Sequence, residues 1–353
     1  MPSLLTAITV LLIIAVCITL IRNDFWLYKV LEYPRLQKLT LLLFTFAAWL
    51  FYWPFQNPIY YFLFGTLCLC IIYVAYKVWP YTTFKAKEMQ TAKNSQPDAE
   101  LKIFAANVFQ DNRQYAPMLQ QIRDTDPDII FLLETNAAWA QAVQSLEKDY
   151  PYTLKEPLEN TYGLLFFSRL KLEKAKVAHL VKPDIPSIEA VVQLRSGQKV
   201  QLWGLHPEPP VPGENLYSTA KDKELMKIAF KAKDCPLPCI VFGDLNDVAW
   251  SHTTELFRKT SKLLDPRIGR GFYSTFSAHH WYIRFPLDYI FCSQEFGLVQ
   301  MKRLPKNGSD HFATFTHLAF NKQLKKEQSA PQADREELQE AKEMAQQPLR
   351  HDA

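Results

Sequence analysis

Long apolar stretches dominate the first eighty residues of the chain. Three of them, at about residues 4–21, 39–55 and 59–76, contain no charged residue. Each approaches the roughly 17–25 residues that a helix needs to cross a bilayer. The second and third also carry Trp and Tyr near their ends, as segments at a membrane–water interface do. The pattern predicts that residues 1–80 form a membrane anchor of three transmembrane helices.

Two other interpretations of these stretches remain open from the sequence. The first stretch could be a cleaved signal peptide, although the residues before it, Met-Pro-Ser, lack the basic character of such a peptide. The second and third could form one re-entrant hairpin, because only residues 56–58 separate them. Each of these two is nearly long enough to cross alone, which favours two separate crossings.

Basic residues indicate how such an anchor is oriented. Four lie between the first and second stretches and four follow the third: Arg22, Lys29, Arg35 and Lys38, then Lys77, Lys85, Lys87 and Lys93. Three crossings put both groups on one side, and the positive-inside rule makes that side cytoplasmic. We therefore expect a multi-pass membrane protein with its N-terminus outside and the bulk of the chain in the cytoplasm. A miscounted helix would invert this orientation.

Residues 100–320 have a different pattern. Short apolar runs rich in β-branched and aromatic residues, such as DIIFLLE, YGLLFFS and CIVFGDLN, alternate with polar segments. Helical patterns fit between some runs, at about residues 115–124, 137–147 and 217–232. This predicts an α/β domain built as a two-layer β-sandwich flanked by helices.

The segments on either side of this domain are polar. Residues 81–99 have no apolar period and are predicted to be a linker. Residues 321–353 are rich in Ala, Glu and Gln and have little to bury, so we expect a disordered or helical tail.

Composition and charge exclude several classes of protein. The 353 residues are 22% charged, but residues 1–100 hold only 8 basic and 5 acidic residues. Residues 101–320 hold 26 Lys and Arg against 24 Asp and Glu, so the domain is nearly neutral. A disordered chain and a uniformly basic nucleic-acid coat are excluded. Six Cys, three of them in the apolar stretches, exclude a disulfide scaffold, and no Gly-rich phosphate loop occurs.

Candidate catalytic groups are polar residues that end or follow the apolar runs of the domain. In chain order they are Asn107, Glu134, His206, Asp244, Asn246, Asp288, Asp310 and His311. Each alone is more commonly a cap, a turn residue or a satisfied buried polar group. Carboxylates, amides and two His that converge at one rim of a sheet suit metal-assisted phosphate chemistry.

This ordered set resembles the endonuclease/exonuclease/phosphatase superfamily. Its most specific parts are GDLN at 243–246 and SDH at 309–311, and the resemblance covers about residues 100–320. The superfamily includes deoxyribonucleases, abasic-site endonucleases, neutral sphingomyelinases and inositol polyphosphate 5-phosphatases. The stretch FGDLNDVAWS, with YSTF and RFPLDYIF, is most similar to a membrane-anchored bacterial branch. That branch implies location in a bacterial inner membrane.

The resemblance implies a divalent-metal site. Glu134, Asn107 and Asp310 would lie at the metal, with Mg²⁺ expected and Mn²⁺ as the alternative. Mg²⁺ suits this set because it takes only one or two carboxylates and keeps several waters. Phe109 stands where some nucleases of the family carry a further carboxylate, which lowers the expectation of a second tightly held metal.

The resemblance also implies catalytic and substrate-binding groups. His311 would act as general base for the attacking water, or hold the phosphate as an imidazolium, with Asp288 accepting its ring N–H. Asp244 would orient the nucleophile or assist a second metal. His206 and Asn246 would donate hydrogen bonds to phosphate oxygens, with Asn107 close to them.

The implied function is Mg²⁺-dependent hydrolysis of a phosphodiester or phosphomonoester by a membrane-anchored enzyme. The substrate stays open among a lipid head group, a small phosphodiester and nucleic acid, and no protein partner is deducible. Alternatives are a membrane-tethered nuclease acting on DNA or RNA, and an inactive membrane-bound binding protein of the same fold. A transport-associated or sensor protein is disfavoured, because the apolar stretches contain no charge that could line a transport path.

Overall fold

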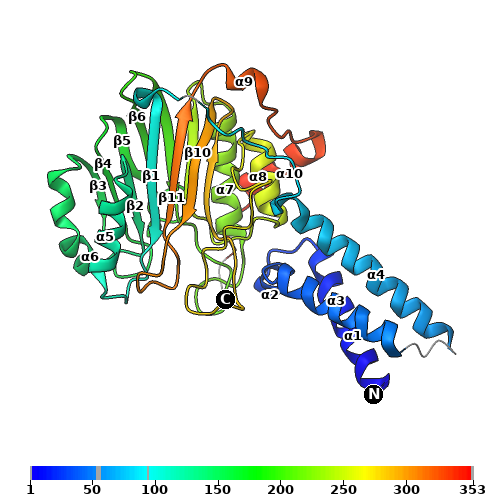
Figure 1. The fold of residues 1–353 in the computed structure, drawn as a ribbon. Coiled ribbons are helices and arrows are strands. Elements are labelled where there is room, and N and C mark those ends of the chain that lie inside the picture. Colours follow the sequence, from blue (N-terminus) through cyan, green and yellow to red (C-terminus); the bar gives the residue numbers. More distant parts are fainter. Residues whose placement is uncertain (1, 53–56, 94, 351–353) are drawn as a thin grey trace.

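The computed structural model describes residues 2–52, 57–93 and 95–350. An N-terminal bundle of helices projects from a larger α/β domain (Figure 1). The bundle contains α1 (Pro2–Cys17), α3 (Arg35–Tyr52) and α4 (Pro58–Val78). A short 3-10 turn, η1 (Ile18–Leu20), and a short helix, α2 (Trp26–Val30), connect α1 to α3, and η2 (Trp79–Tyr81) follows α4.

Two of these helices are long and apolar enough to cross a membrane. They cover Ser3–Leu20 and Pro58–Tyr81, and only 17% of each is buried, unlike the core helix of a soluble protein. The described part of α3 does not meet the same measure, because its first turns carry Arg35, Gln37 and Lys38. The apolar stretch predicted at 39–55 also continues past Tyr52 into residues outside those described. Of the three predicted transmembrane helices, two therefore meet this measure of length and hydropathy, and α3 does not over its described residues.

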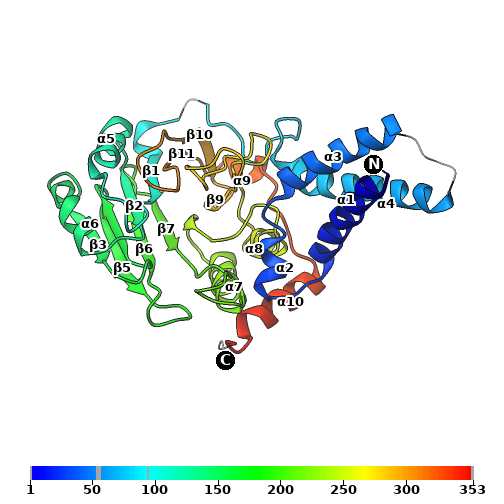
Figure 2. The ribbon, with the colours of Figure 1, turned by 90° about the horizontal axis from the view of Figure 1, so that it is seen from below.

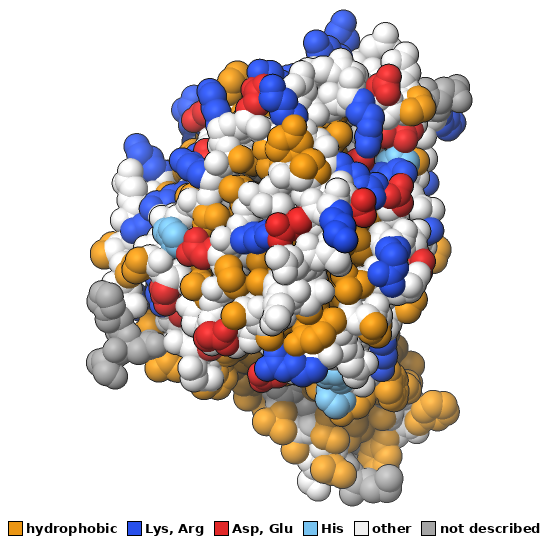
Figure 3. Space-filling model, turned by 90° about the vertical axis from the view of Figure 1, so that its left-hand side faces the viewer, with side chains coloured by type: hydrophobic (Ala, Val, Ile, Leu, Met, Phe, Trp, Pro, Cys, Tyr) orange, Lys and Arg blue, Asp and Glu red, His pale blue; other side chains and the backbone are white. Residues whose placement is uncertain are grey.

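The surface of the bundle differs from that of the domain. Apolar side chains cover much of the part of the molecule below the domain in Figure 3, whereas basic and acidic side chains intermingle over the domain itself. Inside the bundle, Leu42, Trp49 and Leu67 are fully buried. The Trp49 indole donates a hydrogen bond of 2.9 Å to the Thr9 hydroxyl, so a polar contact between α1 and α3 is satisfied within the bundle.

The α/β domain consists of two sheets packed face to face. The six-stranded sheet has the order β10 (Phe296–Arg303), β11 (Thr314–Phe320), β1 (Glu100–Asn107), β2 (Ile129–Leu133), β4 (Leu164–Ser168) and β3 (Tyr152–Glu156). The five-stranded sheet has the order β5 (Leu172–Ala178), β6 (Ser187–Gln193), β7 (Lys199–Leu205), β8 (Cys239–Asp244) and β9 (Asp288–Cys292). Most neighbours are antiparallel, but β1 with β2 and β7 with β8 are parallel.

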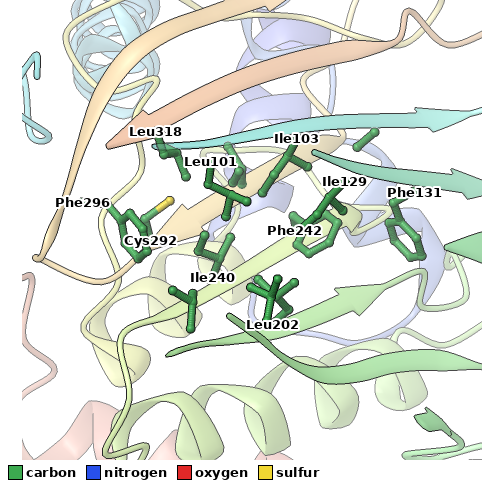
Figure 4. Close-up of a cluster of buried hydrophobic side chains, with 14 of the residues drawn as sticks. Leu101, Ile103, Ile129, Phe131, Leu202, Ile240, Phe242, Cys292, Phe296 and Leu318 are labelled. Carbon is green, nitrogen blue, oxygen red and sulfur yellow. The ribbon is translucent and has the colours of Figure 1, made fainter. Parts of the chain in front are cut away.

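The main core lies between the sheets. Ile103 and Phe131 of one sheet meet Leu202, Ile240 and Phe242 of the other (Figure 4). The Phe131 and Phe242 rings pack edge to face with centroids 5.2 Å apart. Burial of these apolar side chains holds the sheets together.

Helices cover the outer face of each sheet. On the six-stranded sheet lie α5 (Tyr115–Thr125), α6 (Ala137–Ala142) and the 3-10 turn η4 (Gln144–Lys148), and on the five-stranded sheet lie α7 (Thr219–Lys233) and α8 (His252–Ser261). The Ser251 side chain accepts the Thr254 N–H and caps α8. The predicted two-layer sandwich flanked by helices is confirmed.

The two flanking segments pack on the domain. In the predicted linker, which contains the 3-10 turn η3 (Pro97–Ala99), Met89 is fully buried and Thr91 bridges to Leu298 of β10. The tail forms α9 (Leu324–Glu327) and α10 (Arg335–Gln346), and α10 rests against α7 and α8 with Ala341 fully buried. The tail is therefore helical over much of its length but not solvated on every side.

Glu224 of α7 is a buried carboxylate outside the predicted site. Its only described hydrogen bond is accepted from the Ser187 hydroxyl at 2.8 Å. Burial raises its pKa to about 7, with Ser187 and Lys227 opposing the shift. The unfolded chain ionises Glu224 near pH 4.5, whereas the folded chain ionises it only near pH 7. Above pH 7 the ionised group therefore lowers the free energy of unfolding, and below pH 4.5 the protonated group does not.

The Glu224→Gln variant is therefore expected to be more stable than the parent at pH 8, by on the order of 2–3 kcal/mol. The gain should shrink as the pH falls from 7 and vanish near pH 4.5. Melting temperatures of both proteins, measured across this range, check the expectation. Glu159→Gln, at an exposed carboxylate, serves as the matched control without such a gain. A gain for Glu224→Gln that does not depend on pH would contradict the assigned cause.

Candidate active site

The strand topology gathers the predicted site residues at one rim of the sandwich. Asn107 ends β1 and Glu134 follows β2, and these strands are parallel, so both residues leave the same edge. In the other sheet His206 follows β7 and Asp244 ends the parallel strand β8. Asp288 opens β9 directly opposite Asp244. Contacts of β1 and β2 with β8 bring the two rims together.

Asn107 joins the two sheets at this rim. Its amide nitrogen donates to Glu134 Oε1 at 2.6 Å and to Asp244 Oδ2 at 3.1 Å, and its amide oxygen accepts the Phe109 N–H at 3.0 Å. The side chain thus holds two carboxylates close together and turns its nitrogen, not its oxygen, toward them. This placement suits a positioning role better than direct ligation of a metal.

His311 lies between two carboxylates. Its Nδ1 is 2.9 Å from Asp288 Oδ2, and its Nε2 is 3.6 Å from Asp244 Oδ2. Burial disfavours the charged ring, but Asp288 and Asp244 outweigh it and raise the His311 pKa to about 10. The ring is therefore an imidazolium at neutral pH, and the expected contact between His311 and Asp288 is present.

Backbone geometry fixes the GDLN turn that carries Asp244. Gly243 has φ +130°, and a Cβ there would lie 2.1 Å from the Leu205 carbonyl oxygen, so only glycine fits. Asn246 adopts a left-handed φ of 49°, its N–H donates to Asp244 Oδ1 at 2.9 Å, and its side-chain nitrogen donates to the Pro207 carbonyl. The turn orients Asp244 and leaves Asn246 at the edge of the site.

Ser309 ties the SDH segment to β1. Its hydroxyl donates to the Asn107 carbonyl oxygen at 2.8 Å and accepts the His311 N–H at 3.0 Å. The sequence marked this serine only as part of a motif and gave it no separate role. The structure assigns it the positioning of His311 relative to the end of β1.

A cavity of about 250 Å³ opens at this rim. Its polar lining includes the carboxylates of Glu134, Glu214 and Asp310 and the rings of His206 and His311. Among the described residues that line it, none is Lys or Arg. Burial raises the Glu134 pKa to about 7, although the hydrogen bond from Asn107 opposes the shift. Hollows of about 480 and 940 Å³ elsewhere contain neither Glu134 nor His311.

His206 is buried in the cavity wall. Burial lowers its pKa to about 4, although Asp244 opposes the shift, so the ring is neutral at pH 7. Its Nδ1 has no hydrogen-bond partner within the described part of the chain, and its ring centroid lies 5.4 Å from that of Tyr162. A neutral imidazole can still donate one hydrogen bond, in keeping with the expected contact to a phosphate oxygen.

Tyr33 and Phe276 are among the lining residues that were not found from the sequence. Tyr33, from the segment between α1 and α3, donates its hydroxyl to the Asn246 carbonyl oxygen at 2.7 Å. Phe276 packs on His311 with ring centroids 5.1 Å apart. Local pattern gives no signal for either, because each reaches the site only through tertiary packing. Tyr162 has a hydroxyl bonded to Glu214, so it is both packed and part of the wall.

Comparison with known proteins agrees with this arrangement. A sequence model described as the Endonuclease/Exonuclease/phosphatase family matches residues 105–311, more than half of the chain. The chain belongs to the endonuclease/exonuclease/phosphatase family. The resemblance noted from the motifs is thus confirmed. No curated protein sequence matches the chain significantly.

Solved structures share the family fold. TDP2 from D. rerio, complexed with single-strand DNA product, is 18% identical with TM-score 0.52, covering 62% of this chain and 99% of its own. The human nocturnin catalytic domain with bound sulfate is 16% identical with TM-score 0.51, covering 69% and 99%. A conserved protein from Enterococcus faecalis V583 is 15% identical with TM-score 0.51, covering 63% and 100%. At these identities the similarity establishes the fold.

The residues of this family member fit a divalent cation. Glu134, Glu214 and Asp310 put three carboxylates around a cavity in which His311 is the one cationic side chain of the described lining, so further positive charge would favour the binding of a phosphate. The atoms of Asp244, Asp288 and His311 are also close enough, within 4.8 Å, to hold a metal.

Proposed function

We propose that this protein is a membrane-anchored, divalent-metal-dependent phosphoesterase that hydrolyses a phosphate ester by attack of water. The observation that carries the proposal is the His311 imidazolium, held by Asp288 and Asp244 in a cavity that Glu134 also lines. Positive charge, a nearby basic carboxylate and a candidate metal ligand converge there, as hydrolysis of a phosphate ester requires. Membership of the endonuclease/exonuclease/phosphatase family supports the same reaction class.

The protonation states suggest how the roles are divided. With a pKa of about 10, His311 is cationic at neutral pH and suits the binding of a phosphate oxygen, so we favour this role over that of general base. Burial raises the pKa of Asp244, which makes it the better acceptor for the proton of the attacking water. Asp288 keeps the His311 ring oriented, and His206 and Asn246 contact further phosphate oxygens.

The metal in this proposal is Mg²⁺, with Mn²⁺ as the alternative. When bound, such a cation neutralises phosphate charge and stabilises the leaving oxygen. Glu134 and Asp310 would hold it, and Asn107 would fix the Glu134 carboxylate through its amide nitrogen. Mg²⁺ is suited to few carboxylates because it retains waters.

The decisive experiment is a hydrolysis panel with the full-length protein purified in detergent. We expect metal-dependent hydrolysis of bis(p-nitrophenyl) phosphate, p-nitrophenyl phosphate or phospholipid. Activity only on single-stranded DNA or RNA would instead favour the nuclease alternative. Absence of activity on every substrate, with retained metal binding, would favour an inactive binding protein and contradict the proposal.

We also propose that α1, α3 and α4 all cross the membrane, with the domain in the cytoplasm. The three helices run alternately away from and toward the domain, and the N-terminus lies at the far end of the bundle (Figure 1). The basic residues Arg22, Arg35 and Lys77 lie at the ends nearest the domain, where the positive-inside rule puts the cytoplasm.

A topology test follows from this arrangement. A fluorescent protein that matures only in the cytoplasm is expected to fluoresce when fused to the C-terminus. The same protein fused before Met1 is expected to remain dark, and this fusion is the matched control. Fluorescence at the N-terminus alone would reverse the proposed orientation, and fluorescence at both ends would require an even number of crossings.

A further inference from the structure

The loop that connects the cavity to β9 carries large aromatic side chains in solvent. In residues 277–285, Trp281 is 82% exposed and Tyr282 is 55% exposed. Side chains of this size contribute to the core elsewhere in the domain, as Trp139 and Trp250 do. Trp and Tyr are the residues enriched where a protein meets the head-group region of a bilayer.

One end of this loop is joined to the active site. Phe276, just before the loop, lines the cavity and packs on His311. The Ala278 N–H donates to the Asp310 carbonyl oxygen at 2.5 Å, and the Ser277 N–H donates to the Ile283 carbonyl oxygen at 2.9 Å. The exposed aromatic tip is therefore only a few residues from groups proposed to handle phosphate.

The same loop is joined to the helical bundle. The Gln37 side chain, in the first turn of α3, donates to the Tyr282 carbonyl oxygen at 2.9 Å. Tyr33 packs edge to face on Phe285 with ring centroids 5.6 Å apart, and Tyr33 itself lines the cavity. The part of the loop that carries Trp281 and Tyr282 therefore lies beside the start of α3. In the proposed topology, this end of α3 meets the cytoplasmic head groups.

The segment before α3 completes this side of the site. Phe25 pairs through a β-bridge with Tyr217, and the Trp250 indole donates to the Glu32 carbonyl oxygen at 2.8 Å. Lys29 of α2 donates hydrogen bonds of 3.3 Å to Asp222 of α7 and to Thr253 of α8, and Figure 2 shows these helices near one another in the view from below. The helical bundle is therefore packed on the domain, and it contributes Tyr33 to the lining of the cavity.

We infer that residues 277–285 and Tyr33 form a membrane-facing rim that admits the phosphate head group of a bilayer lipid to the cavity. This inference rests on the proposed function and names its substrate class. In the reaction one water is consumed: its oxygen bonds to phosphorus, one P–O ester bond breaks, and the leaving oxygen ends with a proton. A cavity of about 250 Å³ with no Lys or Arg in its described lining suits a single head group better than a nucleic-acid backbone.

Fluorescence provides a test that does not depend on activity. The full-length protein is reconstituted in vesicles of phosphatidylcholine and phosphatidylglycerol, with or without bromine near the head groups of the lipids. The chain has 8 Trp, so the signal of Trp281 is taken as the difference between the parent and Trp281→Phe. Brominated lipid is expected to quench this difference signal, and an unquenched signal would overturn the membrane-facing rim.

Activity provides the second test. For Trp281→Ser combined with Tyr282→Ser, the ratio of phosphatidylglycerol hydrolysis in vesicles to bis(p-nitrophenyl) phosphate hydrolysis is expected to fall about fivefold. Tyr152→Ser is the matched control, because Tyr152 is an exposed aromatic on β3, the edge strand far from the bundle (Figure 1). An unchanged ratio would overturn the inference, as would a selective loss of single-stranded DNA hydrolysis, which would mean base stacking on the aromatics.

The two tests separate this inference from the proposed function. Quenching of Trp281 without hydrolysis of either substrate would reject the phosphoesterase and keep the membrane-facing rim. Hydrolysis of the soluble diester without quenching, and without activity on phosphatidylglycerol, would keep the phosphoesterase and reject the lipid substrate.

Discussion

Replacement of His311 by alanine is expected to reduce hydrolysis of the preferred phosphate ester by about a thousandfold, within the range for loss of one positioned group that stabilises charge in the transition state. The variant loses the buried imidazolium that faces the cavity, and it leaves Asp244 and Asp288 without their shared counter-charge. Steady-state kinetics at saturating metal check the loss in kcat.

The control for this variant is His179→Ala. His179 also contacts a carboxylate, Glu156, at 2.9 Å, but it lies at the surface away from the cavity. It is expected to keep the parent activity. Because removal of one partner of a buried ion pair also costs stability, His311→Gln is compared as well, with melting temperatures of all three. Parent-like activity in folded His311→Ala would reject the assignment of this residue.

Replacement of Glu134 by glutamine is expected to weaken Mg²⁺ or Mn²⁺ binding by about a hundredfold or more and to reduce hydrolysis correspondingly. Glutamine preserves size and the contact with the Asn107 amide through its oxygen, but it removes the negative charge that attracts the cation. Isothermal titration calorimetry with each metal measures the affinity directly, so the result does not depend on knowing the substrate.

Glu159→Gln is the matched control for the metal experiment. Glu159 is exposed, accepts the Ala137 N–H at 3.3 Å and does not line the cavity. Its replacement is expected to leave metal affinity unchanged. If Glu134→Gln bound Mg²⁺ as tightly as the parent, the cation would have to be assigned to other carboxylates, of which Asp244 and Asp288 with His311 form the next candidate group.

Local sequence pattern predicted much of the fold. Apolar runs bounded by polar segments predicted the strands that carry Asn107 and Asp244, and helices expected at about 115–124 and 217–232 occur as α5 and α7. The helices of the N-terminal bundle were predicted for the same reason, since long uncharged stretches coincide with the apolar helices of the structure. The second stretch is the weakest, because α3 begins with charged residues at Arg35 and Lys38.

Local pattern did not predict that the polar segments before and after the domain pack on it. Residues 81–99 lack any apolar period, yet Met89 is fully buried against the domain. The tail has little to bury, yet Ala341 is buried between α10 and the helices beneath it. These segments dock through a few buried side chains together with polar contacts such as Arg258 to Glu88 and Lys259 to Glu337, and contacts of this kind leave no periodic signal.

The sequence by itself determined the composition of the candidate site and the family to which the chain belongs. Which side chains touch was decided only by the tertiary structure, because parallel pairing of β1 with β2 and of β7 with β8 brings distant strand ends to one rim. The same packing sets the charges, since burial and neighbouring carboxylates together raise the pKa of His311 and burial lowers that of His206. It also brings Tyr33, from the segment between α1 and α3, into the cavity wall, where it contacts Asn246, more than two hundred positions away. Local pattern cannot encode such contacts, because they depend on how whole elements pack.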